Sequence, residues 1–443
     1  MRRLKLDLVV PVLLAITLVA FAAGSSSVSG VVRVGHAARW VALFALFGGS
    51  VALALERRGL SRLRVSVVAA GAAFLAIAVE STLWSVDPKL TFERGATFVV
   101  LLLTAAALAA AYADGGERVL WGIVAGAMVV TVLGLVVLAF DHADAVQAAT
   151  YDVPARYRGF GLNPDTVSLL LALCLPVTVW LAFRATSRRS VVAALAAALA
   201  FDASIAASGS RGAIAAGFAG TFVVAVLAPV TVRARIATAA AVVVLAGATI
   251  GVALAPTSKG NAARPKTSSA PAAVAKKPKP GYIDVGSGYP FEFDIGSQGP
   301  GEVAPTHRTL FGLSGRGEAW RGALDLANKR PALGYGFGTE DRVFVNRYAN
   351  FVGGSPEDSY IGLYLQLGAI GLVALLVLVG SLVVGALRRP WRPEAAVSLG
   401  VLTAALVLAV VQSYIYSVGD IGAVTVWVCA FLGAAAVGRR VTA

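Results

Sequence analysis

The stretch VLWGIVAGAMVVTVLGLVVLAF, residues 119–140, contains 22 residues and no charged side chain. A helix of about 20 consecutive apolar residues crosses the hydrocarbon core of a bilayer, so this stretch predicts a transmembrane helix. Working outward from it, apolar runs bounded by charges or turn residues predict eleven more spans. They lie at 8–23, 39–55, 65–83, 95–112, 166–184, 190–207, 212–230, 236–255, 359–386, 394–416 and 418–438. The predicted fold class is an all-α polytopic membrane protein with about 12 transmembrane helices.

The amino-acid composition agrees with a membrane protein. Of the 443 residues, 58% are hydrophobic and 14% are charged, whereas an average soluble domain is about 45–50% apolar and about 25% charged. This excludes a soluble enzyme, a collagen-like chain and a disulfide-stapled secreted domain. Cys174 and Cys429 both lie inside apolar runs, so we expect neither a disulfide nor a metal site.

The distribution of basic residues predicts how the chain crosses the membrane. With the N-terminus inside, the inner loops hold 18 Lys and Arg and the short outer loops hold seven. Since basic residues favour the cytoplasmic side, both termini are predicted to be cytoplasmic, in the cytoplasmic (inner) membrane. The start Met1-Arg2-Arg3 leads directly into an apolar run, which predicts a retained first helix that also serves as the insertion signal.

The membrane helices are interrupted by one long outer loop. We predict membrane helices 1–9 in residues 1–255, an extracytoplasmic loop at 256–357, and membrane helices 10–12 in residues 358–443. Within the loop, residues 257–280 are rich in Pro, Ala and Lys and are predicted to be a flexible insertion. Residues 310–357 are predicted to form a folded cap, because Trp320, Ala323, Leu324 and Ala327 have the spacing of an amphipathic helix. Pro331 ends that helix.

Unusual polar residues gather on the predicted outer side. Arg211 follows Ser208-Gly-Ser210 in a short connection between two apolar helices. A charge at this boundary is costly unless it is paired or faces a polar cavity. Either the side chain extends to lipid headgroups, or its planar guanidinium binds an anionic ligand such as a phosphate. Ser210 beside it would add local hydrogen bonding.

Three more outer arginines would extend the same positive lining, namely Arg156, Arg158 and Arg316. Arg156 and Arg158 are explained equally well as exposed residues of a solvated basic loop. Together with the neighbouring Gly and Asn turns, the four arginines favour a diphosphate-binding pocket. The Gly334–Gly338 run fits no dinucleotide motif and predicts a tight turn.

A candidate general base comes at the end of the loop. Glu357 and Asp358 directly precede a predicted span, so they are either ordinary helix-capping groups or a base that takes a proton from a hydroxyl nucleophile. Asn163 and Asp87 are expected to hold their loops. His307 is expected to be an exposed loop residue, and no metal or cofactor is predicted.

In their order and spacing, these fragments resemble the O-antigen ligase and polysaccharide polymerase superfamily of the Wzy/WaaL type. The resemblance covers most of the chain. It is carried by Trp-Ser-x-Asp-Pro at 84–88, Arg-x-x-Gly-x-x-x-Asn-Pro at 156–164, Ser-Arg-Gly at 210–212, Gly-Arg-x-x-x-Trp at 315–320, Pro331, Gly334-x-Gly336, Ser-Tyr-Ile at 359–361 and Gly368-x-x-Gly371.

The resemblance implies a C-type glycosyltransferase fold whose outer loop caps a cavity open to the bilayer. It implies metal-independent transfer of a glycan from a polyprenyl diphosphate carrier to a hydroxyl of a glycan or glycolipid acceptor. Arg211 and Arg316 would hold the diphosphate, with Arg156 and Arg158 assisting. The family's catalytic histidine falls on Glu357 and the following Asn on Asp358, so this chain departs from the pattern at the base.

Two other functions are compatible with the sequence. A lipid-linked glycan flippase or transporter would place charged residues along the middle of the membrane, but Glu80 and Asp202 are both toward the outer side. No inverted repeat of the transporter kind is visible. A non-catalytic polysaccharide-assembly partner would explain the missing histidine. Ligase and polymerase are not separable by residues, since both use the same type of donor.

Overall fold

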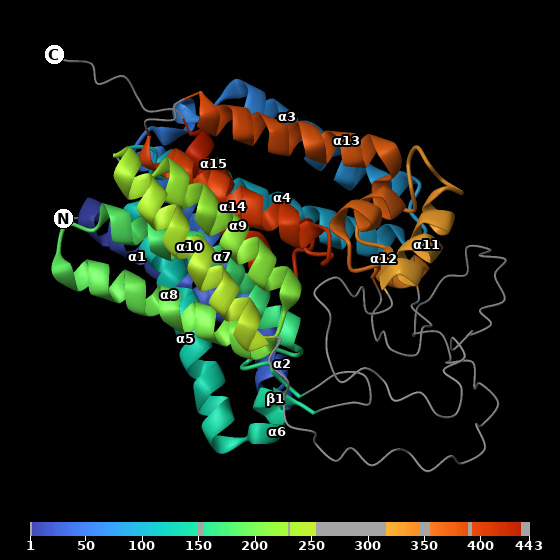
Figure 1. The fold of residues 1–443 in the computed structure, drawn as a ribbon. Helices are drawn as coiled ribbons and strands as arrows, with labels where there is room; N and C mark the ends of the chain where they lie inside the picture. The colour runs from blue at the N-terminus through green and yellow to red at the C-terminus, as the bar shows by residue number, and fades with distance from the viewer. Residues whose placement is uncertain are drawn as a thin grey trace, which may run out of the picture.

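The computed structural model describes residues 2–148, 155–228, 231–253, 316–344, 355–388 and 392–435, and these are overwhelmingly helical (Figure 1). The long helices are α1 (Arg2–Gly24), α2 (Ser29–Glu56), α3 (Val65–Glu80), α4 (Pro88–Ala111), α5 (Glu117–Phe140), α7 (Pro164–Arg184), α8 (Arg188–Ser208), α9 (Arg211–Leu227), α10 (Val232–Ala253), α13 (Ser359–Leu387), α14 (Pro393–Ala409) and α15 (Ile421–Ala434). The short elements are η1 (Gly59–Arg62), η2 (Ser81–Leu83), α6 (His142–Ala145), α11 (Arg316–Ala327), α12 (Glu340–Val343) and the antiparallel strands β1 (Val146–Gln147) and β2 (Arg156–Tyr157).

The chain is a multi-pass membrane protein. Within the described ranges, nine helices are long and apolar enough to cross a bilayer, and α9, α14 and α15 are apolar but shorter. Each of the twelve predicted spans falls on one of these helices. The last predicted span starts too early, because Ser417–Asp420 forms a turn and the Asp420 carboxylate caps α15 by accepting the Gly422 N–H at 2.8 Å. The total of twelve crossings stays a prediction.

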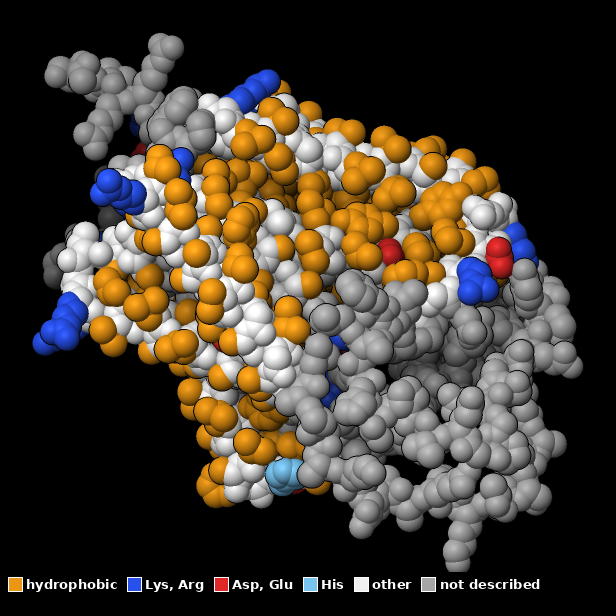
Figure 2. All heavy atoms as spheres, viewed as in Figure 1, with side chains coloured by type: hydrophobic (Ala, Val, Ile, Leu, Met, Phe, Trp, Pro, Cys, Tyr) orange, Lys and Arg blue, Asp and Glu red, His pale blue; other side chains and the backbone are white. Residues whose placement is uncertain are grey.

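Helix burial separates a protein-packed centre from a lipid-type surface. Every residue of α15 is buried, and α7 is buried along most of its length. In contrast, most apolar side chains of α10 are exposed, and only Val242 and Thr249 of this helix are buried. Figure 2 shows the result, a broad face covered by hydrophobic side chains with Lys and Arg standing at its left-hand edge.

Charged contacts join the helix ends on one side of the bundle. Arg57 at the end of α2 and Arg118 at the start of α5 both pair with Asp7 of α1. Arg392, just before α14, donates hydrogen bonds to the carbonyls of Ala113 and Ala435. The beginning of α1 and the end of α15 therefore lie at the same end of the molecule, opposite α11 and α12 (Figure 1).

At that opposite end, α11, α12 and the turn between them form a small cap. We use "cap" for residues 316–344. Its core consists of Ala319, Ala323, Leu326, Ala327, Tyr335, Val343, Phe344 and Leu365 of α13. The expected amphipathic helix is α11, but its buried stripe differs from the expected one, because Leu324 is 36% exposed and Leu326 is buried instead. The predicted insertion at 257–280 and His307 lie outside the described residues.

The Gly334–Gly338 stretch forms a tight turn, as predicted. Gly334, Gly336 and Gly338 have φ of 62°, 105° and 78°, a region that favours glycine. A Cβ on Gly336 would lie 2.2 Å from Ser85 Oγ. The turn packs against a break in α13, where Gly368 has φ 62° and ψ −163°. Tyr335 and Gly336 donate their N–H groups to the carbonyls of Leu365 and Gln366, at 3.1 and 2.8 Å.

Candidate functional site

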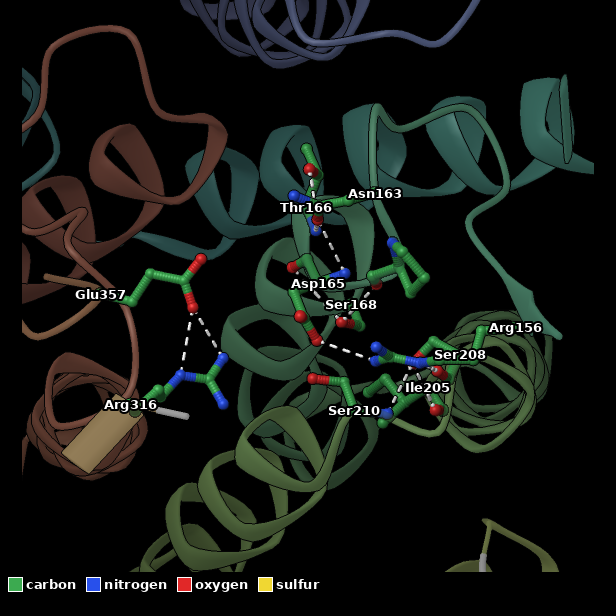
Figure 3. Close-up of polar contacts among 11 residues, drawn as sticks. Arg156, Asn163, Asp165, Thr166, Ser168, Ile205, Ser208, Ser210, Arg316 and Glu357 are labelled. Carbon is green, nitrogen blue, oxygen red and sulfur yellow. Dashed lines mark hydrogen bonds and ion pairs between the residues drawn. The ribbon is translucent and has the colours of Figure 1, made fainter. Parts of the chain in front are cut away.

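The first part of the site is built around the start of α7. Asn163 caps this helix, since its side-chain oxygen accepts the N–H groups of Asp165 and Thr166 at 3.0 and 2.9 Å. The cap places Asp165 in the first turn. There its carboxylate accepts a hydrogen bond from Arg156 Nη2 at 3.0 Å (Figure 3). Arg156 also donates from Nε to the Ser208 carbonyl at 2.7 Å, which ties β2 to the end of α8.

The turn between α8 and α9 supplies the second part. Gly209 has φ 59° and ends α8 in the left-handed conformation, which favours glycine. The next residue, Ser210, hydrogen-bonds the Asp165 carboxylate through its side chain. Arg211 begins α9 and interacts electrostatically with Arg316, Arg156 and Asp165. The charges of the three arginines therefore act on one half-buried acid, Asp165.

The third part joins the cap to α13. Arg316 donates from Nε and Nη2 to Glu357 Oε2, at 3.1 and 2.8 Å, and the two side chains are only 18% and 28% exposed. Figure 3 shows the other carboxylate oxygen of Glu357 pointing away from Arg316. Trp320 Nε1 donates to the Pro356 carbonyl at 3.0 Å, so α11 holds the segment that carries Glu357.

Burial sets the protonation of Glu357. It raises the pKa of this carboxyl, Arg316 opposes the rise, and the negative charge of Asp165 adds to it. The charge of Arg316 also acts on Asp165, so the two carboxylates share one electrostatic environment. A carboxylate with a raised pKa is a better proton acceptor than an ordinary exposed one.

Asp358 has a different position. Its Oδ1 accepts the N–H groups of Tyr360 and Ile361 at 2.8 and 2.9 Å and caps α13. Burial raises the pKa of Asp358, and these two hydrogen bonds oppose the rise. The side chain thus performs the capping role that the sequence left open, and its part in catalysis stays a prediction.

Two predicted residues lie apart from the three arginines. Arg158 donates to the carbonyls of Asp144 and Ala143 at 2.9 and 2.8 Å, and so holds the turn that contains α6. Asp87 caps α4 by accepting the Leu90 N–H at 3.2 Å and pairs with Arg342 of the cap at 3.3 Å. The structure brings together Arg156, Ser210, Arg211, Arg316 and Glu357, with Asn163 and Trp320 in support.

Comparison with known families identifies the part of the chain that contributes most of these groups. Residues 193–376 match the family model described as O-antigen ligase (Wzy_C). This part of the chain is similar to the O-antigen ligase family. The match confirms the resemblance seen in the sequence, although it covers less than half of the chain. No curated protein matches the chain.

The matched residues 193–376 include Arg211, Arg316, Glu357 and Asp358 and leave out Arg156 and its partner. That partner, Asp165, is the main site residue that the sequence analysis missed. In Asn163-Pro-Asp165 the acid lies in the first turn of a helix, where acidic residues are common because they stabilise the helix dipole. Its position next to the Arg156 motif, at the start of a predicted span, could have identified it as a site residue. Among the described residues, no cluster of three or more His, Cys, Asp or Glu could hold a metal ion.

Proposed function

We propose that this protein is an extracytoplasmic glycosyltransferase that moves a glycan from a polyprenyl diphosphate carrier to an acceptor hydroxyl. One observation carries the proposal: the charges of Arg156, Arg211 and Arg316 act on Asp165, and Arg316 pairs with Glu357, near the starts of α7, α9 and α13. The family assignment supports a glycosyltransferase of the O-antigen ligase or polysaccharide polymerase type.

The arginines suit the leaving group. Breaking the bond between the anomeric carbon and the phosphate oxygen leaves charge on the departing diphosphate, and guanidinium groups placed there stabilise it. The positive charges of these arginines would oppose the negative charge that builds up on the diphosphate. Asp165 keeps Arg156 in place through its 3.0 Å hydrogen bond. No metal is needed for this form of charge stabilisation.

Glu357 is the proposed base. The acceptor hydroxyl oxygen forms the new glycosidic bond while its proton passes to the Glu357 carboxylate. Since both hydrogen bonds from Arg316 go to Oε2, the other oxygen is the one that would receive the proton. Arg316 has five N–H donors, so it can hold Glu357 and contact the diphosphate at once. Arg316 would thereby fix the position of the base relative to the leaving group.

The experiment is transfer by purified protein in lipid, with a polyprenyl diphosphate-linked glycan as donor and EDTA present. We expect turnover by wild type and a loss of about 100-fold or more in Arg211→Ala and Arg316→Ala. Arg321→Ala is the matched control, because Arg321 is an exposed arginine on the same helix as Arg316.

The failures separate the competing functions. Donor binding without transfer to any hydroxyl acceptor would favour a flippase or an assembly partner. Turnover that disappears with EDTA would contradict metal independence. Full activity of both arginine variants would show that the diphosphate does not bind at Arg211 and Arg316.

A further inference from the structure

A second polar cavity lies next to the cap and shares no lining residue with the arginine site. Its volume is about 450 Å³, within the range of roughly 300–1,000 Å³ that small-molecule sites occupy. The lining comes from α2, α4, the 337–340 turn, α13 and the Tyr416–Gly419 turn. Its polar and aromatic members include Arg39, Trp40, Arg94, Glu340, Gln366 and Tyr416.

The inner wall of this cavity is a built hydrogen-bonding group. Glu340 is 8% exposed. Its carboxyl accepts a hydrogen bond from the Tyr416 hydroxyl and bonds the Gln366 side chain. Gln366 Oε1 in turn accepts the Gly338 N–H at 2.5 Å. A Cβ on Gly362 would lie 1.8 Å from the Glu340 carboxylate oxygen, so a glycine of α13 makes room for this arrangement.

The opposite wall contributes a cation and an aromatic ring. The guanidinium of Arg39 lies 4.8 Å from the centre of the Trp40 ring. Its Nε is buried and has no hydrogen-bond acceptor among the residues that the structure describes. This nitrogen is closed to the cavity, so a ligand oxygen would bond the other guanidinium nitrogens of Arg39, which lines the cavity.

The mixed charge of the lining favours a neutral sugar over an anionic ligand. Carboxyl groups of Glu340 and Glu93 face the same space as the guanidinium groups of Arg39 and Arg94, so a phosphate would meet negative charge as well as positive. A sugar hydroxyl both donates and accepts, and it fits either kind of partner. The ring of Trp40, which lines the cavity, suits the apolar face of a sugar ring.

The cavity is joined to the proposed base by short polar links. Ser413 Oγ donates to the Asp358 carbonyl and accepts the Asp358 N–H, both at 3.2 Å. Ser413 also hydrogen-bonds Tyr416, the partner of Glu340. The cavity wall and the residue after Glu357 therefore belong to one connected network.

We propose that this cavity binds a neutral sugar unit of the acceptor, with Arg39 and Glu340 as its hydrogen-bonding partners and Trp40 against the ring. The proposal rests on the glycosyltransferase function proposed above and adds where the acceptor is held.

The test compares Arg39→Gln and Glu340→Gln with wild type in two assays. In transfer, we expect the KM for the acceptor to rise about 10-fold while the KM for the donor changes less than twofold, since only acceptor contacts are lost. In binding, soluble oligosaccharide released from the donor by mild acid should raise the thermal unfolding midpoint of wild type but not of the variants. Arg33→Gln is the control, because Arg33 is an exposed arginine on the same helix.

Each outcome decides the proposal. Unchanged acceptor KM in folded variants overturns it while leaving the glycosyltransferase function intact. If wild type transfers nothing, the glycosyltransferase function fails, and the binding assay still judges the cavity. A midpoint raised by inorganic phosphate or by anionic lipid vesicles, but not by oligosaccharide, would assign the cavity to a lipid headgroup and overturn the proposal.

Discussion

Glu357 has φ 50°, a left-handed conformation that costs free energy for a residue with a side chain and that histidine also tolerates. Glu357→Gln keeps the shape but cannot accept the proton, so we expect transfer to fall about 100-fold or more. Glu357→His restores the residue type that the family resemblance implies at this position and should keep measurable transfer.

The pH profile distinguishes the two bases. Because burial raises the pKa of Glu357 and the base acts unprotonated, wild-type transfer should decline as pH falls through a value above the ordinary glutamate range. Glu357→His should decline at a higher pH, nearer about 6.5. Identical profiles, or full activity of Glu357→Gln, would remove Glu357 from the proposed chemistry.

Asp165 illustrates a residue whose role depends on its partners. Asp165→Asn leaves Arg156 without its charged partner, so we expect the donor KM to rise about 10-fold. The double variant with Arg156→Gln should be little worse than either single one, since each breaks the same pair. Asp325→Asn on the exposed side of α11 is the control. Additive effects in the double variant would show that the pair does not act as a unit.

Glu340 should make stability depend on pH. Burial raises its pKa to about 7, against about 4.3 in an unfolded chain. The folded state therefore binds this proton more tightly, so the stabilisation is complete below about pH 4 and is lost as pH rises through 7. Between pH 5 and 8 the thermal unfolding midpoint of wild type should fall more steeply than that of Glu340→Gln. Parallel curves would contradict the assignment.

At the scale of the elements, the break in α13 makes one glycine indispensable. A Cβ on Gly368 would lie 2.3 Å from the carbonyl of Ala332. Any other residue at this position would also have to adopt the left-handed φ of 62°. Gly368→Ala should therefore lower the thermal unfolding midpoint. In the same helix, a Cβ on Gly380 would meet no atom within 4 Å. Gly380→Ala should therefore leave the free energy of unfolding unchanged or raise it by up to about 1 kcal/mol, and the midpoint should not fall. Equal unfolding midpoints for the two variants would show that the break at Gly368 does not require glycine.

The helices were predictable and the site only in part. Apolar runs located every long helix, because the lipid environment demands continuous apolar length. The caps at Asn163 and Asp358 followed from residue type. The break at Gly368 and the buried carboxyl of Glu340 depend on contacts between segments far apart in the chain, which no local pattern contains. For the same reason, Arg156 and Arg158 looked equivalent in sequence but bind different partners.

For the whole molecule, the predicted orientation can be tested with single cysteines. Cys174 and Cys429 are both buried, so each can be replaced by Ser to give a silent background. A membrane-impermeant maleimide should label Arg321→Cys in intact cells and Arg189→Cys only after lysis, because both positions are exposed but lie on opposite sides in the predicted topology. The reverse pattern would invert the topology and place the arginine site in the cytoplasm.

The broken helix α13 ties the cap to the membrane part by more than surface contact. The carbonyls of Leu365 and Gln366, which a continuous helix would bond to residues 369 and 370, accept N–H groups of the cap instead, while the N–H groups of Ala369 and Ile370 donate to the carbonyls of Pro331 and Ala332. Lifting the cap would leave these four backbone groups without their partners, each at a cost of about 1–3 kcal/mol where they stay buried. These bonds therefore oppose a lid-like opening of the cap. If the proposed lipid-linked donor is the substrate, these bonds favour entry sideways between helices, or a movement of the cap together with residues 359–367, over a movement of the cap alone.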